Sequence, residues 1–232
     1  MRLFCFWLLM LVPLVLGAPQ EPSQKELVKS LEARYARSSA LRAVFEERYY
    51  ENGRLLRMEA GSVRFRRPGK MRWDYSIPES KLFVSDGRTV WLYVPADRTA
   101  TRSVVKDTSD WRMPFALLTR SPKLARLCES VTAGDASEAS RPGRAVLHCR
   151  PRDPGGEGRQ QGEILIEADP RSGELSRVKV DTGGGTALEF FFSQWTDDAG
   201  SPDSQFRFEP PAGVAIVNAP TDQSTIGTPD IL

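Results

Sequence analysis

Hydrophobic and polar residues alternate along much of this chain, and a period of two is typical of β-strands with one buried face. The clearest example is the series Met71, Trp73 and Tyr75, which alternates with Arg72 and Asp74. These residues predict a strand that carries large aromatic side chains on one face and charged side chains on the other.

Two tight-turn signals separate strands of this kind. Asp86-Gly87 lies between the apolar runs Leu82–Ser85 and Thr89–Val94, and Asn52-Gly53 is a second turn dipeptide. Glycine adopts positive φ at little cost, so both dipeptides suit the short turns of β-hairpins. The pattern therefore predicts antiparallel pairing around both turns.

An amphipathic helix is expected before the first strand. Ser23 and Glu26 have the spacing of a capping box, in which each side chain satisfies a free backbone donor of the other. The apolar stripe of this helix contains Leu27, Val28, Leu31 and Tyr35. Such a stripe must cover an apolar surface, and the predicted sheet is the nearest candidate.

From residue 41 the period changes to two, with Leu41, Ala43 and Phe45 on one face. Glu46 and Glu47 follow as neighbouring carboxylates, and nothing in the pattern marks either as buried. Further strands are expected at 61–66, 101–105, 144–150, 163–168, 175–181 and 186–195, a brief helix at 111–120, a strand or short helix at 124–131, and loops at 132–143 and 152–162. Many strands joined by short turns predict a mainly antiparallel α+β protein.

The N-terminus has the layout of an export signal. Arg2 precedes an uncharged run from Leu3 to Leu16, which is followed by Gly17 and Ala18. This run is too short to span a bilayer and is typical of a cleaved signal peptide; an uncleaved anchor is the alternative. We expect a signal at 1–17, one domain at 18–217, and a polar, poorly ordered tail at 218–232.

Cysteine usage agrees with an oxidising compartment. Cys5 would leave with the signal, and Cys128 and Cys149 would then form the simplest pair. An even pair in an exported protein predicts a disulfide, although two free thiols are the alternative. His148 is the only histidine, and there is no Cys-x-x-Cys motif. No metal or other cofactor is therefore expected.

Charge and motif content exclude several function classes. The formal net charge is +2, without a tract of clustered basic residues, so nucleic-acid binding is not expected. His148 lies inside a strand pattern, which makes a nucleophilic triad hard to build. No Lys and Thr pair follows Gly183–Gly185 at the spacing of a phosphate-binding loop. The pattern indicates a protein that is not an enzyme.

Four motifs, in order, carry a resemblance to a known family. They are R-P-x-x-x-x-W-x-Y from Arg67, S-D-G-x-x-x-W-x-Y-x-P from Ser85, P-F-A-L-L from Pro114, and F-R-F at Phe206 leading to P-P-A-G-V at Pro210. Together they make the chain resemble the periplasmic outer-membrane lipoprotein carrier family, LolA. The similarity extends from about residue 25 to residue 214.

The resemblance implies an open half-barrel sheet whose concave face is covered by helices that act as a lid. It also implies a periplasmic chaperone that takes triacylated lipoproteins from an inner-membrane release complex to an outer-membrane acceptor. A monomer is expected, because a carrier that must envelop acyl chains works well as one. Arg67 matches the arginine that holds the lid closed through backbone carbonyls. The residues expected to line the acyl-chain cavity are Phe45, Met71, Trp73, Trp91, Phe115 and Leu118.

Two departures and several alternatives accompany this hypothesis. Phe45-Glu46-Glu47 stands where family members often have Phe-x-Gln, and Met71 replaces a frequent aromatic residue. The aromatic residues could instead fill an ordinary core, and Arg67 could be a solvated arginine at the rim. A stress sensor that binds an anti-sigma factor, and a carrier of another amphiphile such as a glycolipid, are the alternative functions.

Overall fold

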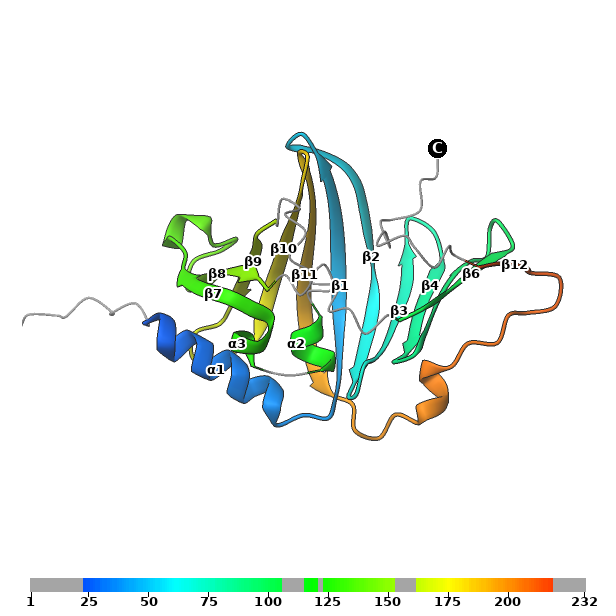
Figure 1. Ribbon diagram of the computed structural model, residues 1–232, viewed down its shortest axis with the longest axis horizontal. Coiled ribbons are helices and arrows are strands. Elements are labelled where there is room, and N and C mark those ends of the chain that lie inside the picture. Colours follow the sequence, from blue (N-terminus) through cyan, green and yellow to red (C-terminus); the bar gives the residue numbers. More distant parts are fainter. Residues whose placement is uncertain (1–22, 106–114, 121–122, 153–161, 219–232) are drawn as a thin grey trace, which may run out of the picture.

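The computed structural model describes residues 23–105, 115–120, 123–152 and 162–218 of the chain. Within these residues, twelve strands form one sheet in the order β12-β6-β5-β4-β3-β2-β1-β11-β10-β9-β8-β7 (Figure 1). Neighbouring strands are antiparallel except for β12 and β6, which are parallel. The first and last strands in this order do not pair, so the sheet stays open. The predicted fold class is confirmed.

The bounds of the strands follow chain order. They are β1 (Ala40–Glu51), β2 (Arg54–Arg66), β3 (Lys70–Ile77), β4 (Lys81–Asp86), β5 (Thr89–Val94), β6 (Thr99–Val104), β7 (Cys128–Ala133), β8 (Ala145–Pro151), β9 (Ile164–Ala168), β10 (Leu175–Gly183), β11 (Thr186–Asp197) and β12 (Ala215–Asn218). The helices are α1 (Gln24–Ala36), α2 (Ala116–Thr119), α3 (Leu124–Leu127) and the short 3₁₀ turns η1 (Ala136–Glu138) and η2 (Asp203–Phe206).

Both predicted hairpin turns are present. Asn52 and Gly53 join β1 to β2 with φ values of 50° and 76°, the left-handed conformation that this dipeptide favours. The Asp86 carboxylate accepts hydrogen bonds from the backbone of Arg88 (2.8 Å) and Thr89 (2.7 Å), which fixes the turn between β4 and β5. Local turn chemistry therefore sets the pairing of these strands.

Three helices lie on one face of the sheet, and the core lies between them and the strands (Figure 1). Leu27, Leu31 and Tyr35 of α1 are buried, as the apolar stripe predicts. Residues of α2 and α3, including Leu118 and Leu124, join the same apolar cluster. We call the face that the helices cover the inner face and the opposite one the outer face.

Helix α1 begins with the predicted capping box: the backbone of Ser23 donates to the Glu26 carboxylate at 2.9 Å. Near its other end, the Tyr35 hydroxyl accepts a hydrogen bond from the backbone of Leu175 at 2.9 Å. The Trp195 indole donates to the carbonyl of the same Leu175 at 2.8 Å. The first bond attaches α1 to the start of β10, and the second joins β11 to the same residue.

The predicted disulfide is present between Cys128 and Cys149. Both residues are buried, and the bond joins β7, which lies at one edge of the sheet, to its neighbour β8. The link closes a loop across a sequence separation of 21 residues. In a chain-entropy model, a loop of this length corresponds to roughly 3 kcal/mol of stabilisation.

Some predicted boundaries were wrong. Residues 124–131 form both a helix and the start of a strand, and the expected loop at 132–143 contains the end of β7 and the turn η1. Strand β2 begins at Arg54, seven residues before its prediction. Strand β12 was missed because its four exposed residues show no alternation and are held by pairing with β6.

Some predictions fall outside the described residues. They are the expected signal, the start of the helix at 111, most of the loop at 152–162 and the tail after 218, which lie in residues 1–22, 106–114, 153–161 and 219–232.

The turn before β10 touches α1 closely enough to be tested. Gly173 has a φ of +71°, and a Cβ on it would lie 2.2 Å from the Ser30 carbonyl oxygen of α1. Gly143 has a similar φ of +80° but open space around it. We predict that Gly173→Ala lowers the free energy of unfolding by about 2 kcal/mol more than Gly143→Ala does, because only the former adds a clash to the conformational cost. Denaturant titration measures both, and equal losses would contradict the contact.

Candidate functional site

An aromatic cluster covers the centre of the inner face. Trp73 lies in its middle, with ring centroids 4.7 Å from Phe45 and 5.6 Å from Phe190. The strands place these rings together because cross-strand partners share a face: Phe45 pairs with Phe192, and Phe65 pairs with Met71. The sheet thus presents a continuous apolar surface on the side where the helices lie.

Residues from outside the sheet cover this surface. Phe115 lies directly before α2, and its ring is 4.7 Å from Trp73 and 5.1 Å from Phe190. Leu118, one turn further on, is only 2% exposed. Helix α2 has only four residues, so tertiary packing rather than helix propensity holds it in place. A short segment of low intrinsic stability therefore covers the aromatic cluster.

Of the six residues expected to line a cavity, five lie in this one apolar cluster: Phe45, Met71, Trp73, Phe115 and Leu118. Their burial agrees with either an acyl-binding surface or an ordinary core, because both need apolar side chains in contact. What distinguishes this core is that helical residues, rather than a second sheet, supply one side of it.

The prediction for Trp91 was wrong. Trp73 pairs with Phe83, which pairs with Leu92, so these three side chains share the inner face. Trp91 is the neighbour of Leu92 and therefore points to the outer face. There its ring lies 5.6 Å from that of Phe208, in the C-terminal segment that crosses the outer face. Trp91 cannot line the same surface as Trp73.

Arg67 binds the last turn of α1. Its guanidinium donates a hydrogen bond to the carbonyl of Tyr35, and its backbone N–H donates to the Ser39 carbonyl at 3.0 Å. Carbonyls at a helix C-terminus carry partial negative charge and attract a cation. Partial burial lowers the pKa of Arg67, since desolvation disfavours the charged form.

The same turn also holds α2. Two residues after Arg67, the backbone N–H of Gly69 donates to the Thr119 carbonyl at 2.8 Å. We call residues 67–69 the clasp turn, because it contacts the C-terminal ends of both α1 and α2. The contact to α2 had not been predicted, since a backbone donor leaves no signal in the sequence.

The clasp turn packs on the β4–β5 hairpin. Gly69 and Gly87 both have positive φ, and a Cβ on Gly69 would lie 3.1 Å from the Gly87 Cα. The Ser85 hydroxyl donates to the Gly69 carbonyl at 3.4 Å. The R-P and S-D-G motifs of the sequence are therefore in contact, and close backbone approach explains both glycines.

A buried carboxyl group was not predicted. Glu47 lies on the inner face, two residues beyond Phe45, and is 7% exposed. The Tyr75 hydroxyl donates to it at 2.7 Å. Burial raises the pKa of Glu47, more strongly than this hydrogen bond lowers it. The position two residues after a buried phenylalanine was the available signal.

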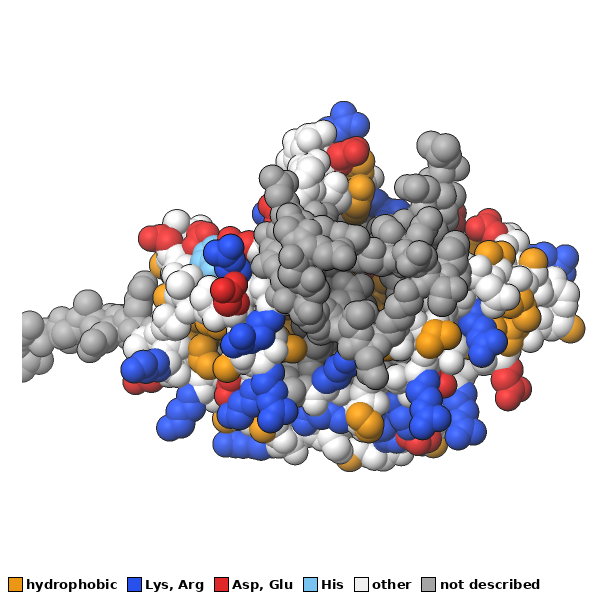
Figure 2. All heavy atoms as spheres, viewed as in Figure 1, with side chains coloured by type: hydrophobic (Ala, Val, Ile, Leu, Met, Phe, Trp, Pro, Cys, Tyr) orange, Lys and Arg blue, Asp and Glu red, His pale blue; other side chains and the backbone are white. Residues whose placement is uncertain are grey.

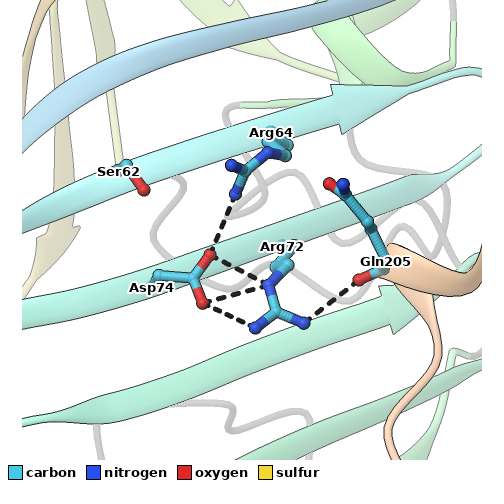
Figure 3. A pocket seen from close by; sticks show the side chains of 5 residues that line it. All are labelled: Ser62, Arg64, Arg72, Asp74 and Gln205. Carbon is cyan, nitrogen blue, oxygen red and sulfur yellow. Dashed lines mark hydrogen bonds and ion pairs between the residues drawn. The ribbon is translucent and has the colours of Figure 1, made fainter. Parts of the chain in front are cut away.

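A separate recess lies on the outer face and is polar. Figure 3 shows Arg64 and Arg72 converging on the Asp74 carboxylate, with Ser62 and Gln205 at the sides. Arg72 donates to Asp74 at 2.7 Å and to the Gln205 carbonyl at 3.2 Å, while Arg64 donates to Asp74 at 3.2 Å. Arg64 also lies 3.7 Å from the Asp198 carboxylate, so two guanidinium groups face two carboxylates. A recess lined by these charges does not suit an acyl chain.

Among the described residues, no group of three or more His, Cys, Asp or Glu side chains could hold a metal ion. No helix in this part of the chain is long and apolar enough to cross a membrane. On the face seen in Figure 2, apolar side chains alternate with charged ones, and Lys and Arg gather along its lower edge.

Comparison with known proteins identifies the family. The model of the outer membrane lipoprotein carrier protein LolA matches residues 38–209. The chain belongs to the LolA family. Among its relatives, an outer-membrane lipoprotein carrier protein of Chromobacterium violaceum is 28% identical over 85% of this chain and 90% of its own length. One from Photobacterium profundum is 27% identical over 90% of this chain and 96% of its own length.

A solved structure of a LolA superfamily protein from Nitrosomonas europaea covers 81% of this chain and 98% of its own, with 10% identity and a TM-score of 0.42. The residues that match the LolA model begin just after α1 and include the sheet from β1 to β11, α2 and the clasp turn. The matched part of the chain thus contains the aromatic cluster, α2 and the clasp turn, while α1 precedes it.

His148, the only histidine of this LolA family member, has a structural environment. Its ring lies 3.0 Å from the Glu138 carboxylate and 3.2 Å from that of Glu163. The hydrogen bond to Glu138, helped by the charge of Glu163, raises the pKa of His148 above its ordinary value of 6.5. The protonated ring therefore stabilises the folded state.

This environment predicts a pH-dependent stability. A raised folded-state pKa contributes fully below the unfolded value and is lost as pH rises through the folded value. We predict that His148→Gln lowers the free energy of unfolding by up to about 1 kcal/mol near pH 6, and that the difference disappears near pH 9. Denaturant titration at both pH values checks this, and a loss independent of pH would exclude the ion pair as its cause.

Proposed function

We propose that this protein is a non-catalytic periplasmic chaperone that binds the acyl chains of outer-membrane lipoproteins and carries them from the inner to the outer membrane. The observation that supports this most is the aromatic cluster of an open sheet, covered by a four-residue helix, in a member of the LolA family. The names of its relatives as lipoprotein carriers agree with this role.

The energetics of lipid transfer explain why such a surface is needed. Removing an acyl chain from water gains about 0.8 kcal/mol per methylene, so a sixteen-carbon chain corresponds to roughly 12 kcal/mol. A lipoprotein cannot cross an aqueous compartment at a useful rate at that cost. The carrier must supply apolar surface in its place, with Phe45, Met71 and Trp73 as the floor in our proposal.

If the ligand and the covering residues take turns on the aromatic cluster, binding of the ligand is reversible without an energy source. Phe115 and Leu118 belong to the same apolar cluster as Trp73, and in our proposal an acyl chain would replace them there. The Arg67 bond to α1 is a charge-assisted hydrogen bond worth about 1.5–3 kcal/mol, set against the cost of partly burying the guanidinium. The Arg67 bond is therefore weak enough for ligand contacts to replace it.

We place the protein in the periplasm, exported by residues 1–17 and acting as a monomer without a cofactor. The disulfide between Cys128 and Cys149 is consistent with an oxidising compartment. In this scheme, an inner-membrane release complex supplies the lipoprotein and an outer-membrane acceptor receives it. Only the acyl chains would enter the site, and the polypeptide of the cargo would remain outside.

Trp73 and Trp91 lie on opposite faces of the sheet and can therefore report where the acyl chains bind. We predict that a lipopeptide with brominated acyl chains quenches tryptophan fluorescence strongly in the native protein and in Trp91→Phe, and less in Trp73→Phe. Bromine quenches at contact distance; Trp73 lies in the middle of the aromatic cluster, Trp195 lies beside Phe192 in the same apolar cluster, and Trp91 lies on the outer face. Trp195 is present in both variants, so the difference between them reports on Trp73 and Trp91 alone. Phenylalanine preserves an aromatic ring at both positions. Equal quenching in both variants would contradict binding on the inner face.

The clasp is tested by substitution of Arg67. We predict that Arg67→Leu changes lipoprotein loading and handover at least fivefold, because it removes the guanidinium bond to the Tyr35 carbonyl. Arg37→Leu, at the exposed C-cap of the same helix, is the matched control. Mass spectrometry of what co-purifies with each mature protein after incubation with spheroplasts provides the measurement.

The outcomes separate the alternatives. Triacylated lipoprotein with the native protein and the Arg37 variant, but altered loading with the Arg67 variant, supports both the carrier and the clasp. Free glycolipid in place of lipoprotein would retain the acyl-binding surface and change the cargo. Absence of any lipid would mean that the aromatic cluster is an ordinary core, and would favour a sensor role.

A further inference from the structure

The inner face changes from apolar to polar halfway along β1. Beyond Phe45, the next residue on this face is Glu47, whose cross-strand partner on β2 is Glu59. Tyr75 lies at the boundary: its ring centroid is 4.9 Å from that of Phe45, while its hydroxyl donates to Glu47. The aromatic cluster therefore ends at a row of buried polar groups, and it extends from there towards the clasp turn.

The two cations of this row, Lys81 and Arg57, both pair with Glu59. Lys81 binds the Glu59 carboxylate at 2.6 Å, and Arg57 approaches it at 3.5 Å. The Lys81 ammonium also lies 4.2 Å from the centre of the Tyr75 ring. Glu47 and Glu59 are both less than 9% exposed, so two neighbouring carboxyl groups are buried on the inner face, and only Glu59 has a cation bound to it at hydrogen-bond distance.

Glu47 is consequently the less compensated carboxyl group of the pair. Burial raises its pKa, and the negative charge of Glu59 acts in the same direction, while Tyr75, Lys81 and Arg57 oppose it. The pKa of Tyr75 is itself well above its usual range, so its hydroxyl remains a donor. With one oxygen of Glu47 accepting from Tyr75, a neutral carboxyl group still has an O–H to donate.

We propose that Glu47, oriented by Tyr75, binds the ester and amide carbonyl groups of the lipid anchor and so fixes the direction in which its acyl chains lie on the inner face. This inference rests on the proposed function, because it concerns the same surface. Ester carbonyls accept hydrogen bonds and cannot donate them, so they require a donor such as the Glu47 O–H. The Lys81 ammonium is the second donor in this row.

The geometry favours one orientation. With the carbonyls at Glu47, the acyl chains run over Phe45 and Trp73 towards Leu41 and the clasp turn. The reverse orientation would place carbonyls among aromatic rings without donors and leave the Glu47 O–H against a methyl end. From Glu47 to Leu41 is six residues, roughly 20 Å of strand. An extended sixteen-carbon chain is also about 19 Å long, from the geometry of C–C bonds.

Paired probes test the carbonyl contact directly. The first is a triacylated lipopeptide with ester-linked glyceryl chains, and the second is its analogue with ether links in place of both esters. We expect the native protein to bind the ester probe about tenfold more tightly, the effect of one buried hydrogen bond. In Glu47→Leu we expect equal affinities, with binding of the ether probe retained. Glu46→Leu, on the outer face, should keep the native preference.

A conservative variant separates the donor from a structural role. Glu47→Gln supplies an amide N–H donor at every pH, so its ester preference should not change with pH. In the native protein, the ratio of the affinity for the ester probe to that for the ether probe should fall towards one as pH rises through the raised pKa of Glu47. The charged groups that face Glu47, namely Arg57, Glu59 and Lys81, and the Tyr75 hydroxyl are the same in both proteins. Isothermal titration with the two probes gives the ratio at each pH.

An ester preference that persists in Glu47→Leu, or that is absent from the native protein, would overturn the carbonyl site. In that case, retained binding of the ether probe would leave the acyl-binding surface intact. Failure of the native protein to bind either probe would instead overturn the proposed function, and the carbonyl site with it. A ratio in Glu47→Gln that follows pH as in the native protein would show that another group is the donor.

Discussion

Burial of the aromatic cluster is the constraint on which the rest of this structure depends. An open sheet has no second sheet to cover its inner face, and the rings of Phe45, Trp73 and Phe190 are too large to leave in water. The chain meets this constraint with helical segments that pack over the face. Each helix contributes only a few apolar residues, so the cover is weakly held compared with the sheet beneath it.

The clasp turn follows from that arrangement. Weakly held helices need attachment at their ends, where backbone carbonyls lack partners within the helix. One turn supplies donors to two of these ends: the guanidinium of Arg67 for α1 and the backbone of Gly69 for α2. Because the turn continues directly from β2 into β3, these donors have a fixed position relative to the aromatic cluster. The same segment thus shapes the floor and holds its cover.

Most of the fold could be predicted from local sequence signals. The capping box at Ser23, the alternation through Phe45 and the Asp86-Gly87 turn each act over a few residues, and each element formed as expected. Trp91 shows where such signals end. Its face depends on the register of β3 against β4, and no two-residue turn fixes that register, because residues 78–80 lie between the strands. A shift of one residue in register reverses the face of every side chain.

The candidate site could be predicted only in part from the sequence, for the same reason. Arg67 and the apolar residues around Trp73 could be named from motifs and period. The environment of Glu47 is made by Tyr75, by Glu59 and by the Lys81 that binds Glu59, which come from three other strands. The bond from Gly69 to α2 uses backbone atoms alone. The environment of Glu47 and the bond from Gly69 both depend on contacts between distant parts of the chain. No pattern within a single segment predicts such contacts.

The division of the clasp between a side chain and a backbone donor has a consequence for how the family can evolve. Substitution at residue 67 alters the attachment of α1, whereas the bond from residue 69 to α2 survives any change of side chain that its close contact with Gly87 permits. Selection can therefore adjust the release of one helix without disturbing the other. Related carriers could reach different cargo affinities by single substitutions at one position, while the sheet and its cover stay the same.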